Sequence, residues 1–445
     1  MEKFTEYISS SGTYYARSIV LNTLRRLQWG LLRINYTNQE GERETIQFGS
    51  QVGDVAIANV TVKDDKVWQR LCSNMDIGMS EAFMLNEVEC DDLVALFTIY
   101  IKNKNALGVG PLFFQMIPRL QRILFGTSNT IENSLKNSIS HYDTSNDLFA
   151  GFLSTDMNYS CPIWSPDDPS LPSNSETLEA AQQRKVHNII HKANIQGSDH
   201  VLDIGCGWAN LAIEAVRLTG CRVRGVMLSA VQKELAEERI KLTGYEDKID
   251  ICLCDYREIP PVEGGYDKIV SVEMLEHIGK EHLKTFFETI TRLLKPGVGK
   301  MVVQGITVTN ERRESKPNLD TFIDRYIFPG GYLPTAQMLL DSIHNGSKGK
   351  LEIRGLQSLG PHYIRALRLW REKFLANWEA AIKPALMRDN PKGGLVRKDE
   401  LEPVKRKWEY YFSCCEAGFR TNMLGDCVIT AQFRDNQDLF SGVPL

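Results

Sequence analysis

The spacing of apolar residues in the first quarter of the chain predicts a small mixed domain. Residues 14–29 place their apolar side chains on one face of a helix, with arginines on the other face. Residues 30–49 predict two strands around a turn at 38–42, and residues 54–64 predict another alternating strand. We therefore expect an N-terminal α+β domain over residues 1–125.

Two segments follow that differ in polarity. Residues 110–126 combine apolar bulk with Arg119 and Arg122, a pattern typical of a segment at a lipid headgroup layer and equally of a helix packed on a neighbouring domain. Residues 126–140 are polar and rich in Ser and Asn, which predicts a linker. The second domain is expected over residues 141–445.

Strands alternate with helices from about residue 198 onward. Such alternation predicts a Rossmann-like α/β fold, in which a parallel sheet is covered by helices on both faces and binds ligands at the carboxyl ends of its strands. The apolar runs that carry this prediction are residues 200–207, 222–228, 249–255, 266–272 and 300–306.

Composition narrows the class of protein. A chain of 445 residues with a formal net charge of -4 can form two or three domains and has no general attraction for nucleic acid. The N-terminus lacks an apolar signal core, and no apolar run reaches membrane-spanning length. The ten cysteines follow no disulfide or zinc spacing. We expect a cytoplasmic protein with reduced thiols and no metal.

The glycine turn after the first strand of this fold indicates the cofactor. Asp203, Gly205 and Gly207 match the start of a dinucleotide fingerprint, but Asn210 replaces its third glycine. The next strand also lacks the acidic residue that would hold a nicotinamide ribose. An aspartate before a glycine turn suits S-adenosylmethionine better.

Further motifs give the chain a specific resemblance that runs almost from end to end. The stretches that carry it include "RLQWGLLRINY", "SHYDTSNDLFAGFLSTDMNYSCPIW", "VLDIGCGW", "GVMLSAVQ", "CDYRE", "EMLEHIG", "RYIFPGGYLPT", "GPHYIRALRLWREKF" and "YYFSCCEAGFR". With these motifs in this order, the chain resembles the cyclopropane-fatty-acyl-phospholipid synthase family of S-adenosylmethionine-dependent methyltransferases.

The resemblance implies where the cofactor would bind. Its methionine end would contact the "NYSC" stretch, its ribose the glycine turn and "LSAVQ", and its adenine the "CDYRE" stretch. The residues assigned in this way are Tyr159, Ser160, Asp203, Gly205, Cys206, Gly207, Trp208, Ser229, Gln232, Asp255 and Tyr256.

The resemblance also implies a bicarbonate ion beside the transferable methyl group. The matching positions are Cys161, Glu276, Gln304, the Ile306 backbone and Tyr363. Gln304 departs from the histidine of bacterial members and agrees with plant-like members. An amide can donate a hydrogen bond to the ion but cannot be protonated, so the charge balance of the site differs.

The stretch "SVEMLEHIG", residues 271–279, carries the acid and base candidates. We interpret Glu276 as the residue that positions bicarbonate, and Glu273 and His277 as structural support. The family pattern also assigns a cysteine to the active site, which falls on Cys415. Thiols are often simply buried, and methyl transfer needs no covalent enzyme intermediate.

The resemblance implies transfer of a methyl group to the cis double bond of an unsaturated phospholipid acyl chain, followed by closure of a cyclopropane ring. It further implies peripheral contact with a membrane face, and a homodimer is compatible with it. Three alternatives stay open: methylation of a secondary metabolite at carbon or nitrogen, a methyl-branched fatty acid product, and a binding protein that has lost turnover.

Overall fold

The computed structural model describes residues 2–37, 41–107, 146–166, 176–309, 321–388 and 401–435. The chain divides into two compact units. Unit 1 comprises Met1–Thr127, Ser315–Pro329 and Leu386–Met423, and unit 2 comprises Ser128–Glu314, Gly330–Ala385 and Leu424–Leu445. The second domain is therefore not the continuous segment 141–445 that the sequence suggested. The predicted interfacial segment 110–126 and linker 126–140 lie outside the described residues.

Unit 1 contains a four-stranded sheet in the order β2-β1-β3-β4. β1 pairs antiparallel with β2 and parallel with β3, and β3 pairs antiparallel with β4. This confirms the predicted pairing of the first two strands, whereas residues 38–40 of the predicted turn lie outside the described residues. Its elements are α1 (Glu2–Leu24), β1 (Gly30–Thr37), β2 (Arg43–Ser50), β3 (Ile57–Val62), α2 (Lys66–Ser73), α3 (Met75–Met84), β4 (Val88–Cys90), α4 (Leu93–Lys102), α5 (Lys104–Leu107), η4 (Ile323–Ile327) and α17 (Leu401–Arg420).

The first helix ends earlier than predicted. α1 stops at Leu24 instead of continuing to residue 29. The backbone N–H groups of Gln28 and Trp29 donate to Oδ1 of Asn103, at 2.7 and 3.0 Å, rather than to a preceding turn. Gly30 then starts β1 with φ +86°, a conformation that glycine adopts without strain. A contact distant in sequence thus sets the helix end.

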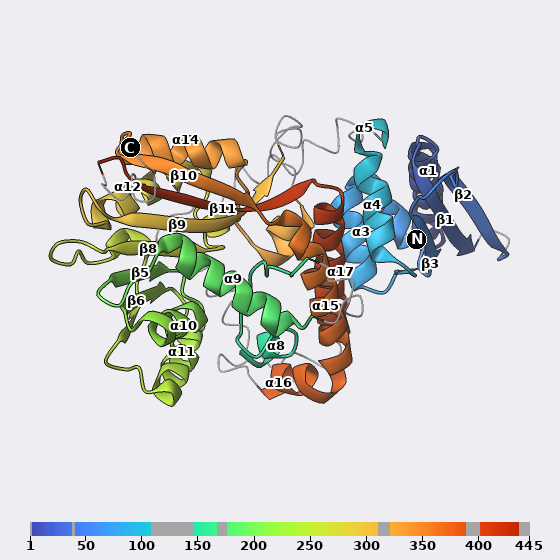
Figure 1. Ribbon diagram of the computed structural model, residues 1–445. Helices are drawn as coiled ribbons and strands as arrows, with labels where there is room; N and C mark the ends of the chain where they lie inside the picture. Colours follow the sequence, from blue (N-terminus) through green and yellow to red (C-terminus); the bar gives the residue numbers. More distant parts are fainter. Residues whose placement is uncertain are drawn as a thin grey trace. The chain divides into compact units, whose positions relative to one another are not determined.

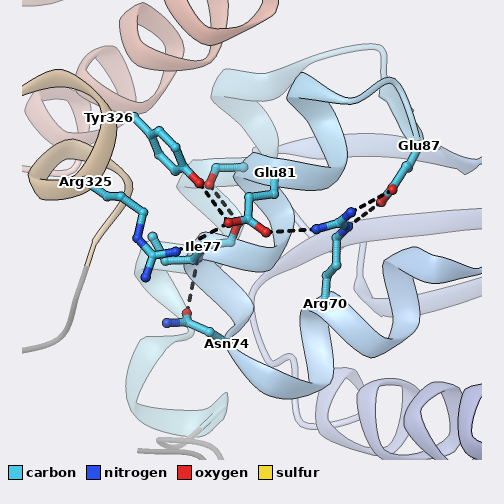
Figure 2. A network of polar contacts seen from close by, with 8 residues as sticks. Arg70, Asn74, Ile77, Glu81, Glu87, Arg325 and Tyr326 are labelled. Atoms are coloured by element: carbon cyan, nitrogen blue, oxygen red, sulfur yellow. Dashed lines mark hydrogen bonds and ion pairs between the residues drawn. The ribbon is translucent and has the colours of Figure 1, made fainter. Parts of the chain in front are cut away.

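A polar network joins the helices of unit 1 to η4 (Figure 2). Arg70 donates to both carboxylate oxygens of Glu87, at 2.7 and 3.1 Å, and to Oε2 of Glu81 at 2.9 Å. The other oxygen of Glu81 accepts from Tyr326 at 2.8 Å and from Arg325 at 3.4 Å. Because Glu87 is only 8% exposed, Arg70 compensates a carboxylate that has little water around it.

We expect Arg70→Ala to lower the free energy of unfolding of unit 1 by about 1–3 kcal/mol, because the buried carboxylate oxygens of Glu87 would lose the donors of Arg70. Urea unfolding followed by tryptophan fluorescence measures this loss. Arg43→Ala is the matched control, since Arg43 is exposed. Equal effects of the two changes would show that the network does not stabilise the unit.

Unit 2 is built on a seven-stranded sheet in the order β10-β11-β9-β8-β5-β6-β7. Figure 1 shows the strands from β10 to β6 side by side. β7, β6, β5, β8 and β9 are parallel, as predicted, whereas β11 runs antiparallel to both β9 and β10. The sheet is therefore mixed, and the last two strands are an addition that the sequence interpretation did not include.

The five predicted strands of unit 2 are confirmed, each within a few residues of its apolar run. They are β5 (His200–Ile204), β6 (Arg222–Met227), β7 (Ile249–Leu253), β8 (Lys268–Val272) and β9 (Lys300–Val308), and the two added strands are β10 (Leu351–Ser358) and β11 (Leu424–Phe433). The helices around them are α8 (Asn146–Ala150), α9 (Leu178–Ala193), α10 (Asn210–Thr219), α11 (Ala230–Thr243), η1 (Tyr256–Glu258), η2 (Leu275–His277), η3 (Lys280–His282), α12 (Leu283–Leu293), α14 (Ala336–Ser347), α15 (Gly360–Asn377) and η5 (Trp378–Ile382).

Side chains of β5 divide between the two faces of this sheet. Leu202 and Ile204 belong to the large apolar core that α12 and α14 complete. Because side chains alternate along a strand, Asp203 faces the opposite side, where α9 packs against β8 and β9. A charged residue at the end of a buried strand is thereby placed beside α9. No helix among the described residues is both long and apolar enough to cross a membrane.

Candidate active site

A cavity opens at the carboxyl ends of β5, β6, β7 and β8, where a ligand site was expected. All the residues that the resemblance assigned to the cofactor line this cavity. Further lining residues include Asn158, Lys185, Glu273, Met274 and His277. The sheet therefore brings together motifs that are separated by up to about one hundred residues in the chain.

The glycine turn forms the floor of the cavity between β5 and α10. Gly205 and Gly207 have φ +85° and +52°, and the backbone N–H of Gly205 donates to the Val226 carbonyl at 2.8 Å. A Cβ atom on Gly205 would lie 2.9 Å from the Met274 side chain. Glycine is thus required at position 205 by both backbone conformation and space.

Asp203 and Lys185 are two of the charged residues that line the cavity. Asp203 is 2% exposed, and its Oδ2 has no hydrogen-bond partner among the described residues. Burial raises the pKa of Asp203 to about 7, against the opposing effect of Lys185. Lys185, on α9, donates to Ser160 at 2.9 Å and to Asn158 at 3.1 Å. A ligand with hydroxyl or ammonium donors would satisfy the free carboxylate oxygen.

The predicted ribose and adenine residues also have local structural roles. Ser229 caps α11 by accepting from the Gln232 backbone at 3.3 Å. Asp255 caps η1 and is held by Arg257 at 2.7 and 2.8 Å. The Tyr256 hydroxyl is buried without a partner among the described residues. The cavity therefore combines fixed carboxylate, amide and aromatic groups with unpaired polar atoms, which suits an adenosyl cofactor.

The residues predicted to hold bicarbonate gather around Glu273 instead. Its Oε1 accepts from the Cys161 backbone N–H at 2.7 Å and from the Gln304 amide at 3.0 Å. Its Oε2 accepts from the Tyr363 hydroxyl. Cys161, Gln304 and Tyr363 are buried. Glu273, which we interpreted as structural support, lies at the centre of this cluster.

The two remaining members of the predicted anion site bind each other. The backbone N–H of Ile306 donates to Oε1 of Glu276 at 2.5 Å, and Oε2 of Glu276 has no partner among the described residues. Burial, followed by the charge of Glu273, raises the pKa of Glu276 to about 8. The groups expected to bind bicarbonate are therefore already bonded to side chains of the protein.

Asp426 on β11 adds a third carboxyl group that the sequence interpretation missed. It is 1% exposed, and burial together with the charges of Glu273 and Glu276 raises its pKa well above the usual range. The pKa of Glu273 is also raised by burial, although hydrogen bonds from Cys161 and Tyr363 oppose the shift. Neighbouring carboxyl groups of this kind cannot all ionise at once.

His277 and Cys415 differ in their relation to the cavity. His277 lines it, and burial lowers the pKa of His277 to about 4, so the imidazole is neutral near pH 7. Cys415 lies on α17 of unit 1 and is not among the residues that line the cavity. The structure therefore gives Cys415 no place in the described site.

Two of the missed residues leave a trace in the sequence. Lys185 occurs on the buried face of α9, together with Gln182, Val186 and Ile189. Asp426 directly precedes the mostly apolar stretch "CVITAQF", and β11 is buried from Asp426 to its end. A charged residue on a buried face is uncommon unless it is paired or functional, and this signal could have identified both.

Comparisons with known proteins identify the family. Residues 129–428 match the model of the family described as mycolic acid cyclopropane synthetase. The tuberculostearic acid methyltransferase UfaA1 of Mycobacterium tuberculosis is 34% identical over 372 residues, which cover 81% of this chain and 80% of the relative. The cyclopropane-fatty-acyl-phospholipid synthase of Escherichia coli K12 is 30% identical over 376 residues, which cover 84% and 87% of the two chains.

A solved structure shows the same fold with a related ligand. The mycolic acid cyclopropane synthase CmaA1, in complex with SAH and CTAB, aligns with a TM-score of 0.56 and 27% identity over 67% of this chain and 98% of that chain. Fold and cavity together define a class I S-adenosylmethionine-dependent methyltransferase. Within that class, the chain belongs to the mycolic acid cyclopropane synthetase family.

The raised pKa of Asp203 predicts that cofactor affinity depends on pH. Below about pH 7 the unliganded carboxyl is mostly protonated and loses part of its capacity to accept hydrogen bonds. The dissociation constant of S-adenosylhomocysteine should therefore rise as the pH falls from 7 to 5, approaching about tenfold per pH unit. Isothermal titration calorimetry measures it, with Asp203→Asn as the control. An equally steep dependence in Asp203→Asn would assign the effect to another group.

Proposed function

We propose that this enzyme transfers a methyl group from S-adenosylmethionine to the cis double bond of an unsaturated phospholipid acyl chain and closes a cyclopropane ring. The observation that carries the proposal is the carboxyl cluster of Glu273, Glu276 and Asp426, whose member Glu273 lines the cofactor cavity. Ring closure, unlike simple methyl transfer to nitrogen, requires a base at the transferred carbon. The lipid-modifying relatives support the same substrate class.

Bound S-adenosylmethionine supplies an electrophilic methyl group on a positively charged sulfur. An alkene is a weak nucleophile, so the site must align it and tolerate the carbocation that forms. Aromatic faces stabilise a cation without capturing it. Tyr159 lies 5.4 Å from Trp370 and 5.3 Å from Phe149 between ring centroids, and Tyr363 lies 6.0 Å from Trp370. This aromatic group lies beside the cavity that Tyr159 lines.

Bicarbonate stays a prediction. The groups expected to bind it are present but bonded to Glu273 and Glu276, so we assign no step to the ion. Membrane contact, a homodimer and a cytoplasmic location likewise stay predictions. We propose transient membrane contact because an acyl chain must be reached within a bilayer.

A methyl-branched product is the second candidate, favoured by the 34% identity to a tuberculostearic acid methyltransferase. Loss of a proton from the transferred carbon after a hydride shift gives an exocyclic methylene group, and a saturated branch would then need a separate reductant. Both products therefore require a base at the same carbon. Coclaurine N-methyltransferase, at 18% identity and a TM-score of 0.63, shares the fold alone.

Incubation with S-adenosylmethionine and a monounsaturated phospholipid should add the mass of one CH2 to the acyl chain, because each product gains a methyl group and loses a proton. Mass spectrometry of the acyl chains measures the gain, and a saturated phospholipid is the control substrate. Cofactor binding without any gain in mass would favour a binding protein over the proposed enzyme. Proton NMR of the product separates a ring from an exocyclic methylene.

A further inference from the structure

The Glu273 carboxylate has the contacts of a bound anion. Three groups from separate parts of unit 2 donate to it: the Cys161 backbone, the Gln304 amide of β9 and the Tyr363 hydroxyl of α15. These are the donors that the sequence assigned to bicarbonate. A glutamate carboxylate has the same planar arrangement of two oxygens, so it can satisfy donors placed for that ion.

Each backbone or side-chain donor of the predicted set already donates to a carboxylate of the protein, and Oε2 of Glu276 is left without a partner among the described residues. Ile306 donates its backbone N–H to Glu276, and Glu273 uses the other three groups. An added bicarbonate would also bring a negative charge next to the carboxyl groups of Glu273, Glu276 and Asp426. The cation whose charge acts on Glu273 is Lys185. Repulsion between neighbouring like charges disfavours such an ion.

Glu273 is also the member of this cluster that reaches the cavity. It lines the cavity, whereas Cys161, Gln304, Glu276 and Tyr363 do not. Its backbone adopts φ +51° at the end of β8, an uncommon conformation for a residue with a Cβ atom. The Glu273 N–H donates to the Gln304 carbonyl at 2.9 Å, so the residue is fixed at both backbone and carboxylate.

We infer that the Glu273 carboxylate is the catalytic base of the reaction and takes the place of bicarbonate. The inference rests on the proposed function. Glu273 accepts a proton from the transferred carbon and becomes a carboxylic acid. The electron pair of the broken C–H bond forms the third C–C bond of the cyclopropane, or the C=C bond of a methylene product. The positive charge of the intermediate is thereby neutralised, and no further reactant is needed.

The charges in the cluster agree with this role. The raised pKa of Glu276, at about 8, keeps that group largely protonated near pH 7, and burial together with the charges of Glu273 and Glu276 raises the pKa of Asp426 in the same direction. Glu273 receives more hydrogen bonds than either, so the single negative charge is best held there. Burial raises its pKa as well, which makes Glu273 a stronger base than a solvated carboxylate.

Glutamine substitutions distinguish the base from its neighbours. In buffers freed of bicarbonate, Glu273→Gln should lower the rate of product formation by at least about 100-fold. Glu276→Gln should cost less, because an amide resembles the protonated form of Glu276. Exposed Glu281 provides the neutral control in Glu281→Gln. Thermal unfolding and S-adenosylhomocysteine binding verify that each variant is folded.

A sharper test removes the Glu273 side chain and asks whether added bicarbonate restores the reaction rate. Glu273→Gly removes the carboxylate and suits the positive φ, so the variant should fold. Bicarbonate should raise its rate by about tenfold or more, while the wild-type rate should not respond. Wild-type dependence on bicarbonate, or full activity of Glu273→Gln, would overturn the inference.

A binding measurement tests the role of Glu273 independently of the proposed lipid substrate. Carbon-13 NMR of labelled bicarbonate, with S-adenosylhomocysteine present, should show line broadening with Glu273→Gly and none with wild type. Specific binding to wild type in this experiment would overturn the replacement, whether or not lipid turnover is detected. Absence of lipid turnover, with the expected binding pattern, would instead refute the proposed substrate and leave Glu273 in the anion position.

Discussion

The hydrogen bonds to the Glu273 carboxylate are the interaction on which the candidate active site depends. A carboxylate withdrawn from water is strongly unfavourable unless donors replace the lost solvation. Cys161, Gln304 and Tyr363 provide those donors, and they come from a loop, a central strand and a helix of unit 2. The fold must therefore hold these elements in register before the charge can be accommodated.

The antiparallel strand β11 adds a further carboxyl group to this site. β11 pairs with β9 so that Asp426 lies opposite Ile306 and Val428 opposite Gln304. β11 thus places a third carboxyl group next to β9, the strand that carries Gln304, near the carboxyl ends of the parallel strands. A fully parallel sheet ending at β9 would provide the cofactor cavity but not Asp426.

The cofactor cavity could be predicted from the sequence because its residues follow strands that are adjacent and parallel. Gly205, Ser229 and Asp255 each come directly after an apolar run, and parallel strands bring such positions to one edge. The carboxyl cluster could not be predicted in this way. Its contacts join Cys161, Glu273 and Tyr363 across about one hundred residues at each step, and only their spatial arrangement shows that Glu273 replaces an expected ligand.

The interpretation of Gln304 changes more than that of any other site residue once its contacts are known. Beside a free bicarbonate, an amide holds the ion less well than a histidine does, since an amide cannot carry a positive charge. Beside a glutamate that belongs to the protein, a neutral donor is sufficient, because the ion does not have to be drawn from solution and held by charge. Glu273 and Gln304 therefore form a matched pair: the covalently attached carboxylate removes the need for a cation at position 304, and the amide fixes the carboxylate at 3.0 Å.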